Sequence, residues 1–184
     1  FLDWPFRTQN PSWNRHLTLA KAHRPKIAVA PDADDSRPLA RVIDSADDLA
    51  QYADTVVVVP KSVPPDAVPA RFRLGIPFAG EAWSGSAGLA HGDLAGRDVH
   101  ILGGSPGRQL RTFGPDSHAS VRVRSRDTSQ PVLFAKVGEV WTAGGRRERP
   151  DLSVPERIAL SVAHMDAAWN GADVHPDEYR LSYG

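Results

Sequence analysis

Three aspartates in this sequence directly follow segments that we expect to be β-strands, where a carboxylate can serve acid–base or nucleophilic catalysis. Asp3 closes the first apolar segment, Asp32 ends IAVAPD and Asp127 ends VRVRSRD. In parallel α/β folds, ligands bind where the carboxyl ends of the strands meet. We therefore expect the three carboxylates at one edge of a sheet. The alternative is that each aspartate forms a turn or caps a helix.

Other polar groups follow two further expected strands. Lys61 ends VVVVPK, and the loop of Gly103, Gly104 and Ser105 ends DVHILGG. The two glycines allow the backbone to approach a ligand closely, and the loop leads into a short helix that contains Gln109. We expect this loop to contact a planar base or a phosphate. A tight structural turn is the alternative.

Two groups of arginines could contact a polyanion. The first alternates with apolar residues in VRVRSRD, and we expect it to pair with surface carboxylates, with a basic groove as the alternative. The second lies in GRRERP, 145–150, which we expect to be a loop that contacts phosphates, with simple solvation as the alternative. The first group is Arg122, Arg124 and Arg126, and the second is Arg146, Arg147 and Arg149.

Several common catalytic and metal motifs are excluded. GGSPG at 103–107 fits the G-x-S-x-G pattern, but Pro106 lacks the N–H that an oxyanion hole needs after the serine. DADD at 32–35 lacks the glycine and glutamate of an EF-hand loop. The chain has no cysteine, and its seven histidines show no ligand spacing. We therefore predict neither a metal nor a cofactor.

The elements that must position these residues indicate an α/β fold. A helix should follow Ser12, a second should start near Ser36 with Asp34 and Asp35 as caps, and a third should follow Ser153. Continuous valine runs between helices are typical of parallel strands covered on both faces. We expect one domain over 1–171, an irregular tail over 172–184, and six strands: FLDWPF, KIAVAPD, TVVVVPK, RLGIPF, DVHILGG and VRVRSRD.

Composition excludes few functions. The 184 residues carry 22 basic and 22 acidic side chains, so any polyanion would have to meet a local patch rather than a net positive charge. No apolar run approaches the roughly 20 residues of a membrane span, and the start shows no leader pattern. We expect a soluble, cytoplasmic protein that does not contact a membrane.

Several segments together resemble a group of small archaeal and phage proteins of unassigned role, and this group resembles the tRNA-guanine transglycosylase superfamily. That superfamily includes phage relatives that place 7-deazaguanines in DNA. VHILGGSP is the distinctive segment, similar to transglycosylase sequences that read roughly HLLGxGxP before the strand of the nucleophilic aspartate. The segments are FLDWPF, RPKIAVAPD, ADTVVVVPK, FRLGIP, VHILGGSPGRQ and SRDTS, followed by GEVW and a final helix.

The resemblance covers nearly the whole chain and implies roles for four residues. Asp127 matches the nucleophile that attacks C1′ of the nucleotide and expels the base. Asp3 matches the general base, which lies near the incoming nucleobase. Asp32 matches the carboxylate that recognises the nucleobase by accepting hydrogen bonds from its ring N–H groups. Gly75 lies in the segment that matches the glycine-containing strand in backbone contact with the base.

The sequence also departs from that superfamily. The segment after Asp3 reads WPF in place of GGFQ, so Trp4 or Phe6 would stack on the base. A chain without cysteine cannot form the Cys and His zinc site of those enzymes. A complete TIM barrel needs about 250 residues, so we expect a reduced or incomplete TIM-type barrel of about six parallel strands.

Taken together, these features lead to the hypothesis of an enzyme that exchanges a guanine or 7-deazaguanine base in tRNA or DNA through an aspartyl glycosyl-enzyme intermediate. Two alternatives remain open. One is a non-catalytic protein that binds a nucleobase or nucleic acid on the same fold. The other is an N-glycoside hydrolase that uses the same carboxylates with water as the acceptor.

Overall fold

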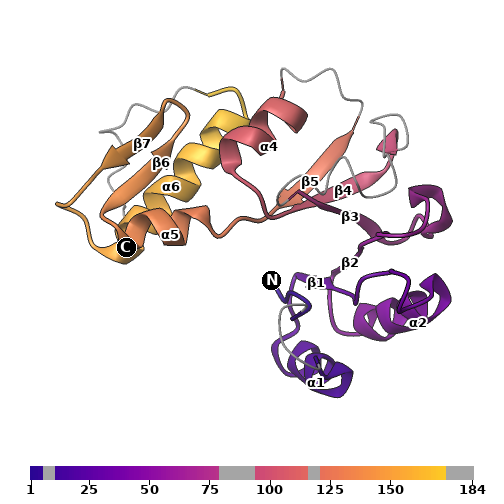
Figure 1. Cartoon of the computed structure of the whole chain (residues 1–184). Coiled ribbons are helices and arrows are strands. Elements are labelled where there is room, and N and C mark those ends of the chain that lie inside the picture. Colours follow the sequence, from indigo (N-terminus) through magenta and orange to yellow (C-terminus); the bar gives the residue numbers. More distant parts are fainter. Residues whose placement is uncertain (6–10, 79–93, 116–120, 173–184) are drawn as a thin grey trace. The chain divides into compact units, whose positions relative to one another are not determined.

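The computed structural model describes residues 1–5, 11–78, 94–115 and 121–172, which divide into two compact units (Figure 1). Unit 1 takes in the described residues of Phe1–Leu102 and Ala119–Arg126, and unit 2 those of Gly103–His118 and Asp127–Gly184. The chain thus passes from unit 1 into unit 2 directly after each of the last two strands of the main sheet. The tail predicted over 172–184 lies, from residue 173 on, outside the described residues.

Unit 1 is built on a parallel five-stranded sheet whose strands follow one another in chain order. This order differs from a doubly wound sheet, in which the strand order reverses, and the sheet curls into a half-barrel. The predicted first strand, FLDWPF, is not a strand in its described residues, where only Leu2 forms a parallel bridge to Ala28 at the β1 side, so this sheet has five strands and not the six predicted. The predicted α/β class is confirmed, and the strands are β1 (Ile27–Val29), β2 (Thr55–Val58), β3 (Arg73–Pro77), β4 (Asp98–Leu102) and β5 (Arg122–Arg126).

Strand β2 of unit 1 is short and apolar on both faces. In β2, the consecutive residues Val56, Val57 and Val58 are all buried. Because successive side chains of a strand point to opposite faces, protein covers both faces of the sheet at this strand. The prediction drawn from the valine run is therefore confirmed.

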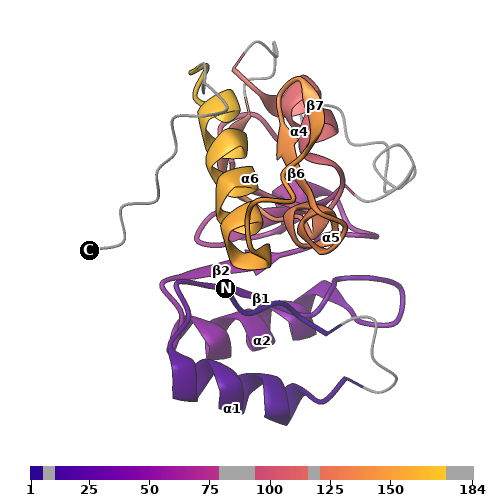
Figure 2. The ribbon, with the colours of Figure 1, turned by 90° about the vertical axis from the view of Figure 1, so that its left-hand side faces the viewer.

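Two helices of unit 1 lie next to each other beside β1 and β2 (Figure 2). The first, α1 (Trp13–His23), begins where predicted, with Ser12 Oγ accepting from the Arg15 N–H at 3.3 Å. The second, α2 (Leu39–Ala50), begins later than predicted. Proline disfavours helical geometry in the residue before it, so the helix starts only after Pro38. A short 3₁₀ helix, η1 (Pro65–Ala67), follows β2.

The residues before α2 form a turn instead of the predicted cap. Asp34 Oδ1 accepts hydrogen bonds from the Ser36 backbone N–H at 3.0 Å and from its hydroxyl at 2.6 Å. The bond from the Ser36 hydroxyl is the main cause that lowers the pKa of Asp34 below its ordinary value. Asp34 therefore stabilises the loop after β1, not the start of the helix.

The arginines of β5 behave largely as predicted. Arg122 and Arg124 each place Nε near Asp98 Oδ1, at 3.0 Å and 3.2 Å. Asp98 is a half-exposed carboxylate at the start of β4, so the prediction of surface pairing is confirmed for these two residues. The register between β4 and β5 shifts between Val99 and His100.

The described residues of unit 2 form three helices and two strands. The long helix, α6 (Val154–Trp169), packs against α5 (Gln130–Lys136) and β6 (Glu139–Thr142) (Figure 2). Strand β6 pairs antiparallel with β7 (Gly145–Glu148), and α4 (Pro106–Phe113) contacts α6. The start of α6 after Ser153 is confirmed, and there the Ser153 backbone N–H donates to Glu156 Oε2 at 2.7 Å.

Strand β7 corrects the predicted loop at GRRERP. Residues 145–148 are all exposed and form the second strand of a hairpin, which Gly145 enters with a φ of 117°. The Thr142 hydroxyl closes the turn by donating to the Gly145 carbonyl at 2.7 Å. A strand with no buried residue has no apolar alternation, so the sequence pattern did not reveal it.

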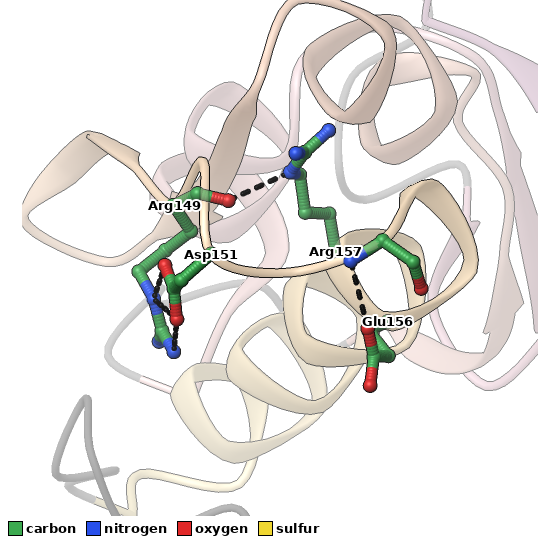
Figure 3. A network of polar contacts seen from close by, with 5 residues as sticks. Arg149, Asp151, Glu156 and Arg157 are labelled. Carbon is green, nitrogen blue, oxygen red and sulfur yellow. Dashed lines mark hydrogen bonds and ion pairs between the residues drawn. The ribbon is translucent and has the colours of Figure 1, made fainter.

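Arg157 joins three parts of unit 2. Its Nε donates to the Arg149 carbonyl (Figure 3), and its Nη1 donates to the Ala135 carbonyl, both at 2.8 Å. Arg149 in turn pairs with Asp151 at 2.8 Å, and hydrogen bonding from Arg149 lowers the pKa of Asp151. Arg157 therefore connects the end of the hairpin, the end of α5 and the first turn of α6.

Among the helices of the described residues, none combines the length and apolar character needed to cross a membrane.

Candidate functional site

The strongest candidate site surrounds Asp127, the residue directly after β5. Its side chain is partly buried, and its Oδ1 accepts a hydrogen bond from the backbone N–H of Gly103, the residue directly after β4. The two residues both belong to unit 2. This contact fixes the direction of the carboxylate, because a backbone N–H cannot rotate away as a side-chain donor can.

The backbone of the Gly103 loop needs glycine at two successive positions. Gly103 has a φ of 68° and Gly104 a φ of 83°, in the left-handed region that other residues rarely adopt. Ser105 then caps α4, its Oγ accepting from the Arg108 N–H at 3.3 Å, and Pro106 is the first helical residue. The structural turn is thus present, and contact of Gly103, Gly104 or Ser105 with a base stays a prediction.

Gln109 lies at the centre of these two loops. It is 0% exposed, and its Nε2 donates to the Gly103 carbonyl at 2.7 Å and to the Asp127 carbonyl at 2.9 Å. The side-chain amide is thus directed at the protein's own backbone, and the substrate contact predicted for Gln109 stays a prediction, which this burial does not support.

Thr128 was missed by the sequence reasoning. Its Oγ1 donates to the Gly104 carbonyl at 2.8 Å and accepts from the Gln130 N–H at 3.2 Å. A threonine after a strand-ending aspartate is a common turn former, which was the available signal. Together with Gln109, it joins the loop after β4 to the loop after β5.

Within unit 1, two of the predicted residues are in contact. Asp32 and Lys61 form an ion pair with 2.6 Å between Oδ2 and Nζ. The backbone prepares this contact, because Lys61 donates its N–H to the Ala33 carbonyl at 2.8 Å, and Ala33 forms a parallel bridge with Pro60. The ends of β1 and β2 thus place a carboxylate and an ammonium group side by side, as parallel strand ends predict.

Asp3 and Trp4 follow a segment that is fixed to β1. The Leu2 N–H donates to the Ile27 carbonyl and the Leu2 carbonyl accepts from Val29, both at 2.9 Å. Asp3 is exposed directly after this pairing. The other candidate for base stacking, Phe6, lies outside the described residues.

Trp4 lies in the core of unit 1. It is 4% exposed and belongs to a core cluster with Val29, Val57 and Val59. Its ring makes an edge-to-face contact with the His16 ring, with 5.2 Å between the centroids. The Arg37 guanidinium lies 5.6 Å from the centroid of the Trp4 ring. Trp4 therefore packs against the sheet, and its predicted stacking on a base stays a prediction, for which this packing gives no support.

Gly75 is also explained by packing. A Cβ at this position would lie 2.7 Å from Val59 Cγ2, 2.8 Å from Val57 Cγ1 and 3.0 Å from Leu102 Cδ1. Real side chains do not approach this closely, so the sheet of unit 1 requires glycine here. Its predicted backbone contact with a base stays a prediction, for which the packing gives no support.

A polar chain across three strands of unit 1 was not predicted. The Arg73 Nη1 donates to Ser125 Oγ at 2.7 Å, and the same oxygen lies 2.7 Å from His100 Nδ1. Burial lowers the pKa of Arg73, and the charge of Asp98 opposes that shift. The signal in the sequence was the serine that interrupts the valines of VRVRS.

The arginines predicted to contact phosphates differ in their surroundings. Arg146 pairs with Glu139 at 3.2 Å and lies over the Phe134 ring, and Arg149 is engaged with Asp151. Arg147 is exposed on β7, and no described residue forms an ion pair or hydrogen bond with its guanidinium. Arg147 is therefore the most available of the three for an anionic partner.

These arrangements permit carboxylate chemistry at Asp127. A carboxylate held by a backbone N–H can act as a nucleophile or as a proton acceptor for a group placed against it. The part of the chain that the structure describes contains no group of three or more His, Cys, Asp or Glu residues able to hold a metal ion.

Comparison with known proteins identifies one family. Residues 1–170 match a family of unknown function, DUF6610. No curated protein and no solved structure matches the chain. Because the match covers most of the 184 residues, the chain belongs to the family of unknown function DUF6610.

Proposed function

We propose that this protein is a base-exchange transglycosylase in which Asp127 is the nucleophile, on a reduced TIM-type barrel. The observation that supports this role is the contact of the Asp127 carboxylate with the Gly103 N–H. A nucleophile must approach C1′ along one direction, and a fixed carboxylate loses little freedom on doing so. The resemblance of VHILGGSP and SRDTS to transglycosylase segments gives the substrate class.

The proposed reaction has two displacements. One Asp127 oxygen bonds to C1′ of a nucleotide, the C1′–N bond breaks, and its electron pair leaves with the guanine base, which takes up a proton from water. An incoming base then gives up a ring proton and bonds to C1′ through that nitrogen. The bond between C1′ and Asp127 breaks, and the carboxylate is restored.

Two further carboxylates have roles in this proposal that rest on the resemblance alone. Asp3 accepts the proton from the incoming base, and Asp32 accepts hydrogen bonds from the donor edge of guanine or 7-deazaguanine. Asp32 is already paired with Lys61. A base that binds Asp32 therefore either displaces the ammonium group or binds beside it. The substrate polymer is tRNA or DNA.

The proposal also includes a phosphate contact by Arg147. Its exposed guanidinium has no ion pair with a described residue, so a phosphate can bind it without breaking one of those pairs. Replacing Arg147 with alanine should therefore weaken nucleic-acid binding and reduce the slope of log K against log salt by about 1. Arg146→Ala, which first loses the pair with Glu139, should change that slope less.

The direct test is incorporation of labelled guanine, or a labelled 7-deazaguanine precursor, into tRNA and separately into duplex DNA. The intact protein should make label acid-insoluble with one of the two polymers. Asp127→Asn should abolish incorporation, because an amide is a far weaker nucleophile. Asp48→Asn, the same change at an exposed site on α2, should leave it intact.

Other results would favour the two alternatives. Release of free base from the polymer, without incorporation, would identify a hydrolase that uses water as the acceptor. Binding of the base that survives Asp127→Asn, with no exchange by the intact protein, would identify a binding protein. Incorporation that persists in Asp127→Asn would refute the role of Asp127.

A further inference from the structure

The amide of Gln109 is oriented by its surroundings and leaves one buried atom unpaired. Its Nε2 faces two carbonyl oxygens, which only accept hydrogen bonds, so the reversed amide would place three acceptors together. In the observed orientation, Oε1 is buried and has no hydrogen-bond partner among the described residues. An unpaired buried acceptor lowers stability, so packing alone does not explain a glutamine here.

The two hydrogen bonds of Gln109 act on the two residues that form the Asp127 contact. One carbonyl belongs to Gly103, whose N–H holds the carboxylate, and the other belongs to Asp127 itself. The side chain therefore fixes the backbone on both sides of that contact. All three residues belong to unit 2.

We propose that Gln109 is a positioning residue that keeps the Gly103 N–H directed at the Asp127 carboxylate. Two donors on a single planar amide suit this task. Glutamate would present an acceptor to the two carbonyls, and methionine, of similar length, would present no donor. The effect of this positioning on catalysis rests on the proposed function, whereas its effect on the Gly103–Asp127 contact does not.

The structural arm of the test measures hydrogen exchange of backbone amides by NMR on the full chain. In Gln109→Met, the Gly103 amide should exchange about tenfold faster than in the wild type, the ratio expected for loss of one ordinary hydrogen bond. Gln51→Met, the same change at an exposed glutamine after α2, should leave this rate unchanged. An unchanged Gly103 rate in folded Gln109→Met would overturn the proposal.

A second variant separates positioning from a general loss of stability. Thr128→Val removes a neighbouring link between the same two loops, the bond to the Gly104 carbonyl. It should lower the melting temperature while the Gly103 amide keeps its slow exchange. Equal acceleration at Gly103 in both variants would show that any loosening of the loops suffices, and would overturn the specific role of Gln109.

A measurement on the wild type keeps the proposal testable if Gln109→Met does not fold. Both side-chain amide hydrogens of Gln109 should exchange slowly with solvent, because each is bonded to a carbonyl and the side chain is 0% exposed. Fast exchange of these hydrogens in the folded protein would contradict the proposed arrangement.

The catalytic arm uses the incorporation assay. Gln109→Met should lower kcat about 100-fold and change KM less than about threefold, because a misplaced nucleophile affects the transition state more than binding. A change confined to KM would overturn the catalytic role. If the intact protein shows no incorporation while Gly103 responds as expected, the proposed function fails and the positioning by Gln109 stands.

Discussion

Asp32 and Lys61 lie at the ends of adjacent parallel strands and are joined by an ion pair of 2.6 Å. The carboxylate of Asp32 is 15% exposed and the side chain of Lys61 is 40% exposed. The pair therefore has one partner largely shielded from water, for which loss of the opposite charge is more costly than at an open surface.

Lys61→Met should lower the free energy of unfolding by about 1 kcal/mol at low salt, because Asp32 then keeps its charge without a cationic neighbour. Urea titration would measure the loss. The difference from the wild type should shrink in 1 M salt, where screening acts over about 3 Å. A double-mutant cycle with Asp32→Asn isolates the interaction, and a coupling energy near zero would contradict the expectation.

Gly75→Ala should destabilise the protein by about 1–3 kcal/mol, the usual cost of adding a methyl group to a filled core. Its Cβ would meet Val57, Val59 and Leu102 at 3.0 Å or less. Gly107→Ala is the matched control, because the nearest atom there is Arg111 Nη1 at 3.5 Å and the site is helical. The control should be stabilising by about 0.5–1 kcal/mol, and equal effects of the two changes in thermal unfolding would refute this account.

Two buried histidines should make the protein less stable in mild acid. Burial lowers the pKa of His16, against the effect of the bond to the Val29 carbonyl, and burial followed by the charge of Arg149 lowers the pKa of His164. Between the lowered folded pKa and the unfolded value of 6.5, the unfolded chain binds more protons. The free energy of unfolding should therefore fall as pH drops below 6.5, by at most about 1.4 kcal/mol per pH unit and histidine.

Urea titrations between pH 5 and pH 8 would test this dependence. His164→Leu should flatten the slope below pH 6.5, whereas His23→Gln, at the exposed end of α1, should leave it unchanged. Carboxylates such as Asp34, whose pKa is lowered by Ser36, lose their contribution only near pH 4 and below. A flat wild-type profile from pH 8 to pH 5 would count against buried neutral imidazoles.

Arg157→Lys should lower the free energy of unfolding by about 1–2 kcal/mol, although the charge is kept. The guanidinium donates to the Ala135 and Arg149 carbonyls through two different nitrogens, and a single ammonium cannot span both positions. Bonds from a charged group to backbone acceptors contribute about 1.5–3 kcal/mol. Arg147→Lys is the control, because this exposed guanidinium donates to no carbonyl of the described residues. Equal melting temperatures for both variants would contradict the prediction.

The strands and helices that the sequence predicted were those with an apolar pattern. The valines of β2 and the cap and apolar stripe of α1 were sufficient to predict these two elements. An element with a buried face needs apolar residues at the spacing of a strand or a helix, and this spacing can be read in the sequence. Strand β7 has no buried residue, and α5 has only seven residues, so neither shows a period that can be read. The delayed start of α2 depends on Pro38, which disfavours helical geometry in the residue before it and so acts independently of the apolar pattern.

The candidate site was predictable in position but not in detail. The sequence placed Asp127, Asp32 and Lys61 at strand ends, because parallel strands follow a simple rule. It could not show that Gln109 and Trp4 are buried, since burial of a polar or amphipathic side chain depends on contacts distant in sequence. The hydrogen bond from Gly103 to Asp127 depends on the left-handed backbone of a glycine, which sequence type alone permits but does not impose.

The chain order of the parallel strands has a consequence for how the protein is made. In the order β1-β2-β3-β4-β5, every strand after the first joins a neighbour that has already been synthesised. The sheet can therefore grow one strand at a time as the chain leaves the ribosome. Synthesis of the chain is slow enough for each strand to pair before the next one emerges. Only the newest strand then exposes an unpaired edge on the growing side, so a nascent chain has few hydrogen-bonding groups open to other chains during its synthesis.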